Sequence, residues 1–372
     1  MNTTGGNNWK VILIPFSWLY GLVIWIRNSL YDHGFFKSFA FKIPLISVGN
    51  ITVGGTGKTP HVEYLAELLN SEFKVATLSR GYKRRTKDFR IASAGSTVSE
   101  IGDEPLQIKK RFPGVDVAVD RKRANGIREL MQLAPWLEVI LMDDAYQHRS
   151  VKPGFSILLV DYNRPISQDR LLPAGMLREP ARNLNRANIV LVTRSPERIK
   201  PIELREYANK IGLSIGQHLY FTSMRYGEIS PVFPDSTKRD VTWFKKHVGA
   251  VLIVAGIANP RPLRQYARGI NTNIRELFFP DHHHYSGRDM EKISRTYREL
   301  KEQHKKVLVL TTEKDAMRLH DHNPDDALRN ALHAVRIHVH FLNDDKDEFD
   351  RQILNYVNSN KRSSILYQGE DS

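Results

Sequence analysis

The sequence predicts an α/β protein with a doubly wound parallel sheet, followed by a second, smaller α/β domain. Short apolar runs bounded by polar or turn residues recur along the chain, as expected for strands buried on both faces of a sheet. Segments with apolar residues at helical spacing lie between them. The chain has 372 residues, of which 41% are hydrophobic, so it is long enough to bury two cores.

The first block of the chain supplies the strands of the larger sheet. We expect strands at Leu45–Val48, Val75–Leu78, Val115–Val119, Val139–Met142, Ile157–Val160 and Ile189–Val192. Between the first two, the segment from Val62 to Leu69 has the spacing of an amphipathic helix. Alternation of strands with helices predicts parallel strands joined by crossover helices on both faces of the sheet.

A second alternating block follows a stretch rich in Gly, Pro, Ser and charged residues, which we interpret as a linker. Its expected strands and helices are Val248–Ala255, Pro262–Ile270, Arg288–His304, Val307–Leu310 and Val335–Phe341. The chain is therefore expected to divide into an N-terminal helix (1–28), a larger domain (29–225), a linker (226–245), a smaller α/β domain (246–360) and a frayed tail (361–372).

Composition limits the classes of partner and chemistry. The chain contains no cysteine, which excludes disulfides, thiolate zinc sites and cysteine nucleophiles. Its formal net charge of +14 favours anionic partners such as nucleic acid, acidic lipid head groups or phosphorylated substrates. Charge alone does not choose among these three.

The N-terminal segment from Val11 to Ile26 is mostly apolar and carries no charge. It is shorter than the ~20 residues that span a bilayer, and Pro15 and Gly21 weaken it as a continuous helix. Flanking aromatic and basic residues suit the headgroup region, so we expect a membrane-associated helix that dips into the surface or lies on it. The alternative is a buried helix packed on the first domain.

A glycine-rich loop follows the first predicted strand and precedes the first predicted helix. In such loops, backbone N–H groups and the helix N-terminus cradle phosphates, while the lysine, here Lys58, reaches the β- and γ-phosphates. The Thr59 hydroxyl is a ligand for Mg²⁺. Thr52 stands where the strict pattern has its first glycine, but the strand and helix context supports a P-loop NTPase-type sheet that binds ATP. The expected nucleotide contacts are Thr52, Val53, Gly54, Gly55, Thr56, Gly57, Lys58 and Thr59.

Asp143 and Asp144 directly follow a predicted buried strand. A phosphate-binding loop needs an acidic partner for its metal, commonly at the end of a neighbouring strand. Adjacent carboxylates at such a point are costly unless a cation or hydrogen bonds satisfy them. We therefore expect both to serve Mg²⁺, with a solvated turn as the alternative.

The chemistry of their residues does not assign a role to two further polar segments. Asp103 and Glu104 lie beside turn residues, as a general base on a loop requires. Three histidines, His282, His283 and His284, follow Asp281, and they fit either a metal site or a polar loop. Of these two, the polar loop is favoured.

Taken in order, the motifs resemble those of the tetraacyldisaccharide 4'-kinases, the lipid A 4'-kinases of Gram-negative outer-membrane biogenesis. The resemblance covers nearly the whole chain, so it is more specific than the glycine loop by itself. The residues that carry it are Ser47 to Asn50 with the loop from Gly54 to Pro60, Ser79 to Tyr82, Gly102 to Pro105, Asp120-Arg121, Asp143-Asp144 with Gln147-His148, Leu171 to Gly175, Leu177 to Pro180, Ala255 to Ile257, Phe279 with Asp281-His282, and Thr312 to Asp315.

The resemblance implies transfer of the ATP γ-phosphoryl group to the 4'-hydroxyl of an acylated disaccharide 1-phosphate lipid. It implies that Asp103 and His282 act together on the acceptor hydroxyl and that Glu179 joins Thr59, Asp143 and Asp144 around Mg²⁺. The enzyme is then expected at the cytoplasmic face of the inner membrane, since its substrate stays in the bilayer. The residues expected at the anionic head group of the lipid are Arg80, Arg84 and Arg121.

Two departures from the family pattern concern backbone turns. Ala145 stands where a glycine follows the paired aspartates, and Ala258-Asn259 replaces Gly-His. The first is expected to restrict the backbone near the metal, and the second puts a role for that loop in doubt.

Two rival functions are weaker on sequence grounds. A nucleic-acid-stimulated ATPase predicts a basic stripe with interleaved aromatics and helicase motifs, which the sequence lacks, so no nucleic-acid partner is expected. A GTPase is suggested by the segment from Thr312 to Asp315, but its lysine stands one place too late.

Overall fold

The structure is a computed structural model that describes residues 9–82, 84–233, 235–281 and 283–368. The chain forms two compact units. The first unit comprises Met1–Gly95, Ile108–Met224 and Val339–Ser372, and the second comprises Ser96–Gln107 and Arg225–His338. The short segment Ser96–Gln107 therefore belongs to the second unit, although the sequence analysis assigned it to the first domain.

The first unit contains the larger sheet, in the order β8-β7-β6-β1-β5-β2-β4-β3. Every pairing between β8 and β4 along this order is parallel, and the short edge strand β3 pairs antiparallel with β4. The expectation of a large, mostly parallel sheet is confirmed. The strands are β1 (Leu45–Gly49), β2 (Val75–Ser79), β3 (Arg90–Ile91), β4 (Asp116–Val119), β5 (Val139–Asp143), β6 (Phe155–Asp161), β7 (Ile189–Thr193) and β8 (His218–Pro231).

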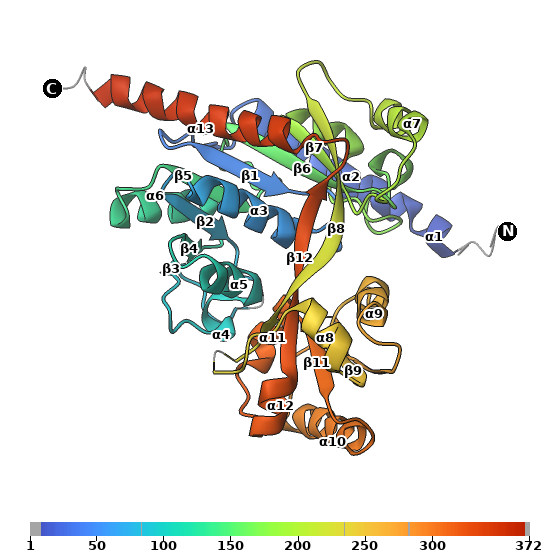
Figure 1. Cartoon of the computed structure of the whole chain (residues 1–372). Coiled ribbons are helices and arrows are strands. Elements are labelled where there is room, and N and C mark those ends of the chain that lie inside the picture. The colour runs from blue at the N-terminus through green and yellow to red at the C-terminus, as the bar shows by residue number, and fades with distance from the viewer. Residues whose placement is uncertain (1–8, 83, 234, 282, 369–372) are drawn as a thin grey trace. The chain divides into compact units, whose positions relative to one another are not determined.

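Helices cover both faces of this sheet (Figure 1). Ile127 and Leu130 of α6 (Arg123–Leu133) are fully buried against Leu78 and Met142. The helix α3 (Lys58–Asn70) contacts β1, β2 and β5, but its side chains do not join the α6 cluster, so it packs on the opposite face. Burying each such side chain contributes about 1.5–3 kcal/mol. The remaining helices here are α7 (Pro201–Ile211), α13 (Lys346–Gln368) and the short helices Ile166–Gln168 and Ala181–Arg186.

The second unit repeats this arrangement on a smaller scale. Its strands β10 (Ile274–Phe278), β9 (Ala250–Ala255), β11 (Val307–Thr312) and β12 (Leu332–Phe341) lie in that order and pair in parallel. Leu252 packs in one cluster with α10 (Gly287–Gln303), whereas the adjacent Val251 packs in another with α9 (Arg261–Arg268). Alternate side chains of one strand thus serve helices on opposite faces. The other helices are α4 (Val98–Ile101), α5 (Asp103–Arg111), α8 (Val241–His247), α11 (Glu313–Leu319) and α12 (Asp326–Ala331).

The expected linker and tail differ from the structure. Residues 226–231 belong to β8, and α8 begins at Val241, inside the expected linker. The burial of β8 alternates irregularly beyond Ser223, so the strand lacks the continuous apolar run that identifies the others. The helix α13 continues to Gln368, past the expected domain end at residue 360.

The N-terminal segment forms two helices, α1 (Trp9–Ile12) and α2 (Ile14–Asp32). Pro15 lies in the first turn of α2, where its missing N–H costs nothing. One face of α2 is fastened to the first unit: the Ser17 hydroxyl donates to the Leu171 carbonyl at 2.9 Å, and Arg27 donates to that of Gln147 at 2.9 Å. Other side chains are open to solvent, including Trp18 at 73% exposure.

The helix α2 is therefore packed on the first unit without being buried in it. Its exposed large apolar side chains are Phe16, Trp18, Leu19, Leu22, Val23, Trp25 and Ile26. Among the residues that the structure describes, no helix combines the length and hydrophobicity needed to cross a membrane.

Candidate active site

The glycine loop lies where the sequence predicts it, between the end of β1 at Gly49 and the start of α3 at Lys58. Gly57 has φ +81°, and a Cβ atom there would lie 2.4 Å from the Met224 methyl carbon. Glycine adopts this left-handed backbone conformation without strain, and it has no Cβ atom to collide with Met224. The Thr193 hydroxyl donates to the Thr56 carbonyl at 2.8 Å, which ties the loop to the end of β7. The first turn of α3 carries no acidic residue, so its N-terminus suits an anion.

His61, on the first turn of α3, links the glycine loop to β8 through its two ring nitrogens. Its Nδ1 lies 2.8 Å from the Gly57 carbonyl oxygen, and its Nε2 lies 3.0 Å from the Thr222 hydroxyl. Burial lowers the pKa of His61 to about 4, although the bond to Gly57 opposes the shift. The ring is therefore neutral near pH 7, with Nδ1 donating to Gly57 and Nε2 accepting from Thr222. The sequence analysis missed this residue, because nothing local marks a histidine whose partner lies on β8.

Lys58 and Asp144 form an ion pair at the mouth of the loop. The Lys58 Nζ lies 3.5 Å from Asp144 Oδ1 and 3.5 Å from the Asn50 side-chain oxygen. Arg178 adds a second cation, with Nη1 3.7 Å from Asp144 Oδ2. Two cations thus converge on one half-exposed carboxylate beside the loop. Such a cluster is suited to holding the charges of a polyphosphate.

The backbone at the aspartate pair shows how the chain accommodates Ala145. The left-handed conformation, with φ +48°, occurs at Asp144 itself. Ala145 is not among the positions with positive φ, and its N–H donates to the Val48 carbonyl at 3.3 Å. An alanine is therefore compatible with this turn. At the second departure, the Asn259 side chain accepts from the N–H of Arg261 at 3.2 Å, beside the start of α9.

A buried arginine fixes the end of β5, where Asp143 lies. Arg123 donates to the carbonyls of Asp120 at 2.5 Å and Asp143 at 3.0 Å. Burial lowers its pKa to about 10, while the charges of Asp143 and Asp144 act in the opposite direction. Arg123 is thus protonated near pH 7 and joins the ends of β4 and β5. Arg123 was not among the residues predicted to belong to the site.

Glu179 reaches this region because its segment pairs with the glycine loop. The Val53 N–H donates to the Met176 carbonyl at 2.8 Å, and the Arg178 N–H donates to that of Ile51 at 2.7 Å. The Glu179 side chain is 1% exposed, and its Oε2 accepts from Arg186 and, at 2.7 Å, from Asn183. Its Oε1 is buried and has no hydrogen-bond partner among the described residues.

The donor atoms of the predicted metal residues suit Mg²⁺. Glu179 Oε1 is an orphaned buried carboxylate oxygen, and Asp143 is a buried carboxylate at a strand end. Hard oxygen donors of this kind are the ligands that Mg²⁺ prefers. Within the described ranges, no group of three or more His, Cys, Asp or Glu side chains has the geometry of a metal site. Mg²⁺ usually takes only one or two protein carboxylates, with waters and phosphates as its other ligands.

Asp103 is buried in the second unit, at the first residue of α5 rather than in a loop. Its carboxylate pairs with Arg318, and the Lys314 Nζ lies 3.9 Å from its Oδ2. The second predicted residue of the pair, His282, lies outside the described residues. Its neighbour His283 has Nε2 3.0 Å from Asp289 Oδ2 and stacks on Phe279 at 4.8 Å, which fits the polar-loop interpretation.

The three arginines predicted at the lipid head group differ in their surroundings. Arg80 and Arg121 are exposed. Arg84 is 5% exposed, and its guanidinium donates to the carbonyls of Asp88 at 2.7 Å and Lys87 at 3.2 Å. Arg84 therefore holds its own loop. Arg80 lies near His148, whose pKa is lowered to about 4 by burial and then by the charge of Arg123.

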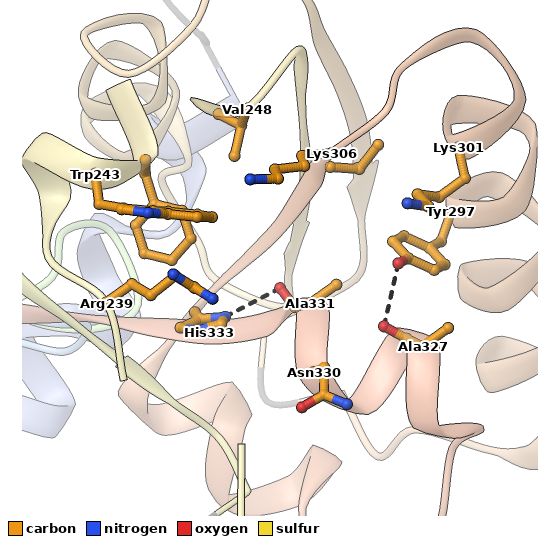
Figure 2. A pocket seen from close by; sticks show the side chains of 12 residues that line it. Arg239, Trp243, Val248, Tyr297, Lys301, Lys306, Ala327, Asn330, Ala331 and His333 are labelled. Carbon is orange, nitrogen blue, oxygen red and sulfur yellow. Dashed lines mark hydrogen bonds between the residues drawn. The ribbon is translucent and has the colours of Figure 1, made fainter. Parts of the chain in front are cut away.

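A separate hollow of about 220 Å³ lies in the second unit (Figure 2). Trp243 lines it, with the Arg239 guanidinium carbon 3.8 Å and the Lys306 Nζ 4.7 Å from its ring centre. The Tyr297 hydroxyl donates to the Ala327 carbonyl at its other end. None of the residues predicted to act on nucleotide, metal or lipid lines this hollow.

Three comparisons with known proteins agree with one another. The family model for tetraacyldisaccharide-1-P 4'-kinase matches residues 9–358. A tetraacyldisaccharide 4'-kinase of Phocaeicola vulgatus is 47% identical over 361 residues, covering 96% of this chain and 97% of that protein. One of Bacteroides thetaiotaomicron is 45% identical over 369 residues, covering 97% and 96%. The crystal structure of LpxK from Aquifex aeolicus in complex with ATP superposes with a TM-score of 0.72 at 28% identity, covering 94% of this chain and 99% of that chain.

Proposed function

This chain belongs to the tetraacyldisaccharide-1-P 4'-kinase family, whose members phosphorylate the 4'-hydroxyl of tetraacyldisaccharide 1-phosphate with ATP in lipid A biosynthesis, and we propose how its residues divide that reaction. The chain has this activity as a member of the family. The proposal concerns the roles of Lys58, Asp143, Glu179 and Asp103 and the surface that meets the lipid.

The glycine loop binds the phosphates of ATP through residues 52–59, and Lys58 neutralises the charge that develops on the transferred group. The observation that carries this role is the convergence of Lys58 and Arg178 on Asp144, at 3.5 and 3.7 Å. A polyphosphate that enters the loop competes with Asp144 for Lys58. Lys58 is thus paired with Asp144 before ATP binds and pairs with a phosphate of ATP afterwards.

Thr59, Asp143, Asp144 and Glu179 hold Mg²⁺ in this proposal, with the orphaned Glu179 Oε1 as its main support. Bound there, the ion would neutralise negative charge on the phosphates of ATP. The chain contributes the positions of the ligands: Arg123 fixes the end of β5, and the pairing of Ile51 and Val53 with residues 176–178 holds Glu179 beside the loop.

Asp103 acts on the acceptor hydroxyl together with His282. A carboxylate that orients an imidazole raises its basicity, so the pair is suited to accept the proton of the 4'-hydroxyl as it attacks phosphorus. The pairing with Arg318 supports this role, since it holds the buried Asp103 carboxylate in one orientation.

The exposed apolar face of α2 rests on the membrane that contains the lipid acceptor. Aromatic side chains such as Trp18 and Trp25 suit the headgroup boundary. Arg80 and Arg121 hold the anionic head group, while Arg84 maintains its loop. In this proposal the enzyme works at the cytoplasmic face of the inner membrane.

Replacement of Lys58 tests the site assignment. Lys58→Ala should abolish transfer of phosphate from ATP to the disaccharide lipid while the circular dichroism spectrum and melting temperature stay near those of the wild type. Lys210→Ala, on the exposed side of α7, is the matched control and should keep activity, because Lys210 is exposed and pairs with exposed Glu206 at 4.0 Å. Activity of Lys58→Ala near the wild-type level would remove the loop from the mechanism.

A further inference from the structure

Arg318 connects two buried carboxylates that are far apart in the sequence. Its side chain, on α11, is 4% exposed. One terminal nitrogen, Nη2, donates to Asp103 Oδ2, and the other, Nη1, lies 3.4 Å from Asp315 Oδ1. All three residues lie in the second unit, although Asp103 comes from the short segment Ser96–Gln107.

The second partner of Arg318 is itself rigidly held. Asp315 is fully buried, and its Oδ2 accepts from the Gly256 N–H at 3.0 Å and the Thr312 hydroxyl at 2.8 Å. Burial raises the pKa of Asp315, while Thr312, Gly256 and Arg318 act in the opposite direction. The network thus joins the end of β9, the start of α11 and the start of α5.

The same network contacts the segment on either side of residue 282. A Cβ atom on Gly256 would meet the Pro280 carbonyl oxygen at 3.0 Å and the His283 Cβ at 3.2 Å, so this segment packs closely on Gly256. Tyr285 lies beside Asp315, and burial raises the pKa of this tyrosine. The groups that hold Arg318 in place are therefore also the groups that Pro280, His283 and Tyr285 contact.

We propose that Arg318 is a positioning residue for phosphoryl transfer: anchored through Asp315, it fixes the orientation of the Asp103 carboxylate. This inference rests on the proposed role of Asp103. A guanidinium suits the task because its planar fork reaches two carboxylates at once in fixed directions. Lys314 does not replace it, since its Nζ lies 3.9 Å from Asp103 and closer, at 3.3 Å, to Glu104.

A positioning role predicts which kinetic constant changes. Loss of Arg318 leaves Asp103 in place but lets its carboxylate turn, which lowers kcat because proton acceptance depends on orientation. The glycine loop that binds ATP belongs to the first unit, whereas Arg318 and its two carboxylate partners belong to the second, so KM for ATP should change little. A lysine at 318 keeps the charge but not the fork, so Arg318→Lys should recover only part of the loss.

The experiment is a double-mutant cycle in kcat with the full-length protein. We expect Arg318→Gln to lower kcat about tenfold or more with KM for ATP within about twofold. The same substitution is then made in Asp103→Asn. Relative to the residual kcat of Asp103→Asn, Arg318→Gln should lower kcat by less than about twofold. Arg298→Gln, which breaks an exposed ion pair with Asp325 at 2.8 Å in the same unit, is the matched control and should leave kcat unchanged.

Each other outcome has a separate meaning. An equal loss of kcat from Arg318→Gln in both backgrounds would show a general structural role and overturn the inference, as would an unchanged kcat in the first background. Wild-type activity of Asp103→Asn would instead remove the proposed role of Asp103. If Arg318→Gln does not fold because Asp103 and Asp315 are left unpaired, the Arg318→Gln, Asp315→Asn variant removes one buried charge, and the cycle is measured in that protein.

Discussion

The His61 imidazole holds the carbonyl of Gly57, the left-handed residue at which the phosphate-binding loop enters α3. The distance from Nδ1 to that oxygen is 2.8 Å, and the opposite ring nitrogen is engaged by Thr222. The Gly57 carbonyl can only accept, so the neutral ring carries its proton on Nδ1 and accepts from the Thr222 hydroxyl at Nε2. The shape of the loop is therefore tied to the tautomer of one buried histidine.

Folding stability should fall with acidification because of this residue. The pKa of His61 is about 4 in the folded chain and near 6.5 when exposed, so the unfolded chain binds the proton first. Stability is then complete above pH 6.5 and is lost as the pH falls toward 4, by about 2 kcal/mol between pH 7 and 5 from this group.

Urea unfolding at pH 7 and pH 5 measures the effect. His61→Gln removes the titrating group, so the difference in free energy of unfolding between the two pH values should shrink by about 2 kcal/mol relative to the wild type. His33→Gln, at an exposed position, is the control and should leave the pH dependence unchanged. An unaltered difference in His61→Gln would mean that the ring accepts a proton without penalty.

Glu179→Gln should lower kcat about 10- to 100-fold and raise the Mg²⁺ concentration needed for half-maximal activity. The orphaned Oε1 of Glu179 becomes an amide group, a weaker ligand, while the volume of the side chain is preserved. Steady-state rates over a range of Mg²⁺ concentrations provide the measurement. Glu206→Gln, on exposed α7, serves as the control. If the Mg²⁺ dependence of Glu179→Gln matches that of the wild type, Glu179 is not a metal ligand.

Asp103→Ala and His282→Ala should each lower kcat, and the double variant should be much less impaired than the product of the two losses. Residues that act as one unit give such non-additive effects, because removing either disables both. Single-turnover rates at saturating ATP would report the chemical step. Losses that multiply in the double variant would argue that the two side chains work independently.

Replacing Trp18, Leu22 and Trp25 with serine should reduce partitioning to vesicles that contain anionic lipid by about tenfold or more. These side chains are at least half exposed on α2, so their removal subtracts apolar area from the membrane contact and leaves the packed face intact. Sedimentation with vesicles gives the partition coefficient. Trp136→Ser, at an exposed tryptophan outside α2, is the control, and equal partitioning of the triple variant and the wild type would contradict membrane contact through this face.

Local patterns were enough for the sheet and the phosphate loop. Buried strands such as β1 and β5 appear as apolar runs because helices cover both faces, and the loop identifies itself by its glycines. Residues 226–231 of β8 were interpreted as part of a linker because this end of the strand is only partly buried and contains Gly227. This end of β8 shows neither the alternation of buried and exposed residues nor the continuous apolar run by which a strand can be predicted.

The supporting residues of the site were not predictable in this way. Arg318, Arg123 and His61 make their decisive bonds across the fold, to residues whose nearness depends on strand order. Arg84 shows the converse: we expected it at the lipid head group, whereas its guanidinium donates to carbonyls of its own loop. Sequence pattern identifies charge and hydropathy, but the partner of a buried polar group depends on long-range contacts.

Tandem mass spectrometry of the reaction product tests the central claim most directly. The purified chain is incubated with Mg²⁺, a tetraacyldisaccharide 1-phosphate in detergent micelles, and ATP whose γ-phosphate carries ¹⁸O. We expect one labelled phosphate on the distal glucosamine of the lipid, at the 4'-position, and none with Lys58→Ala. Labelled inorganic phosphate with an unchanged lipid would contradict the account.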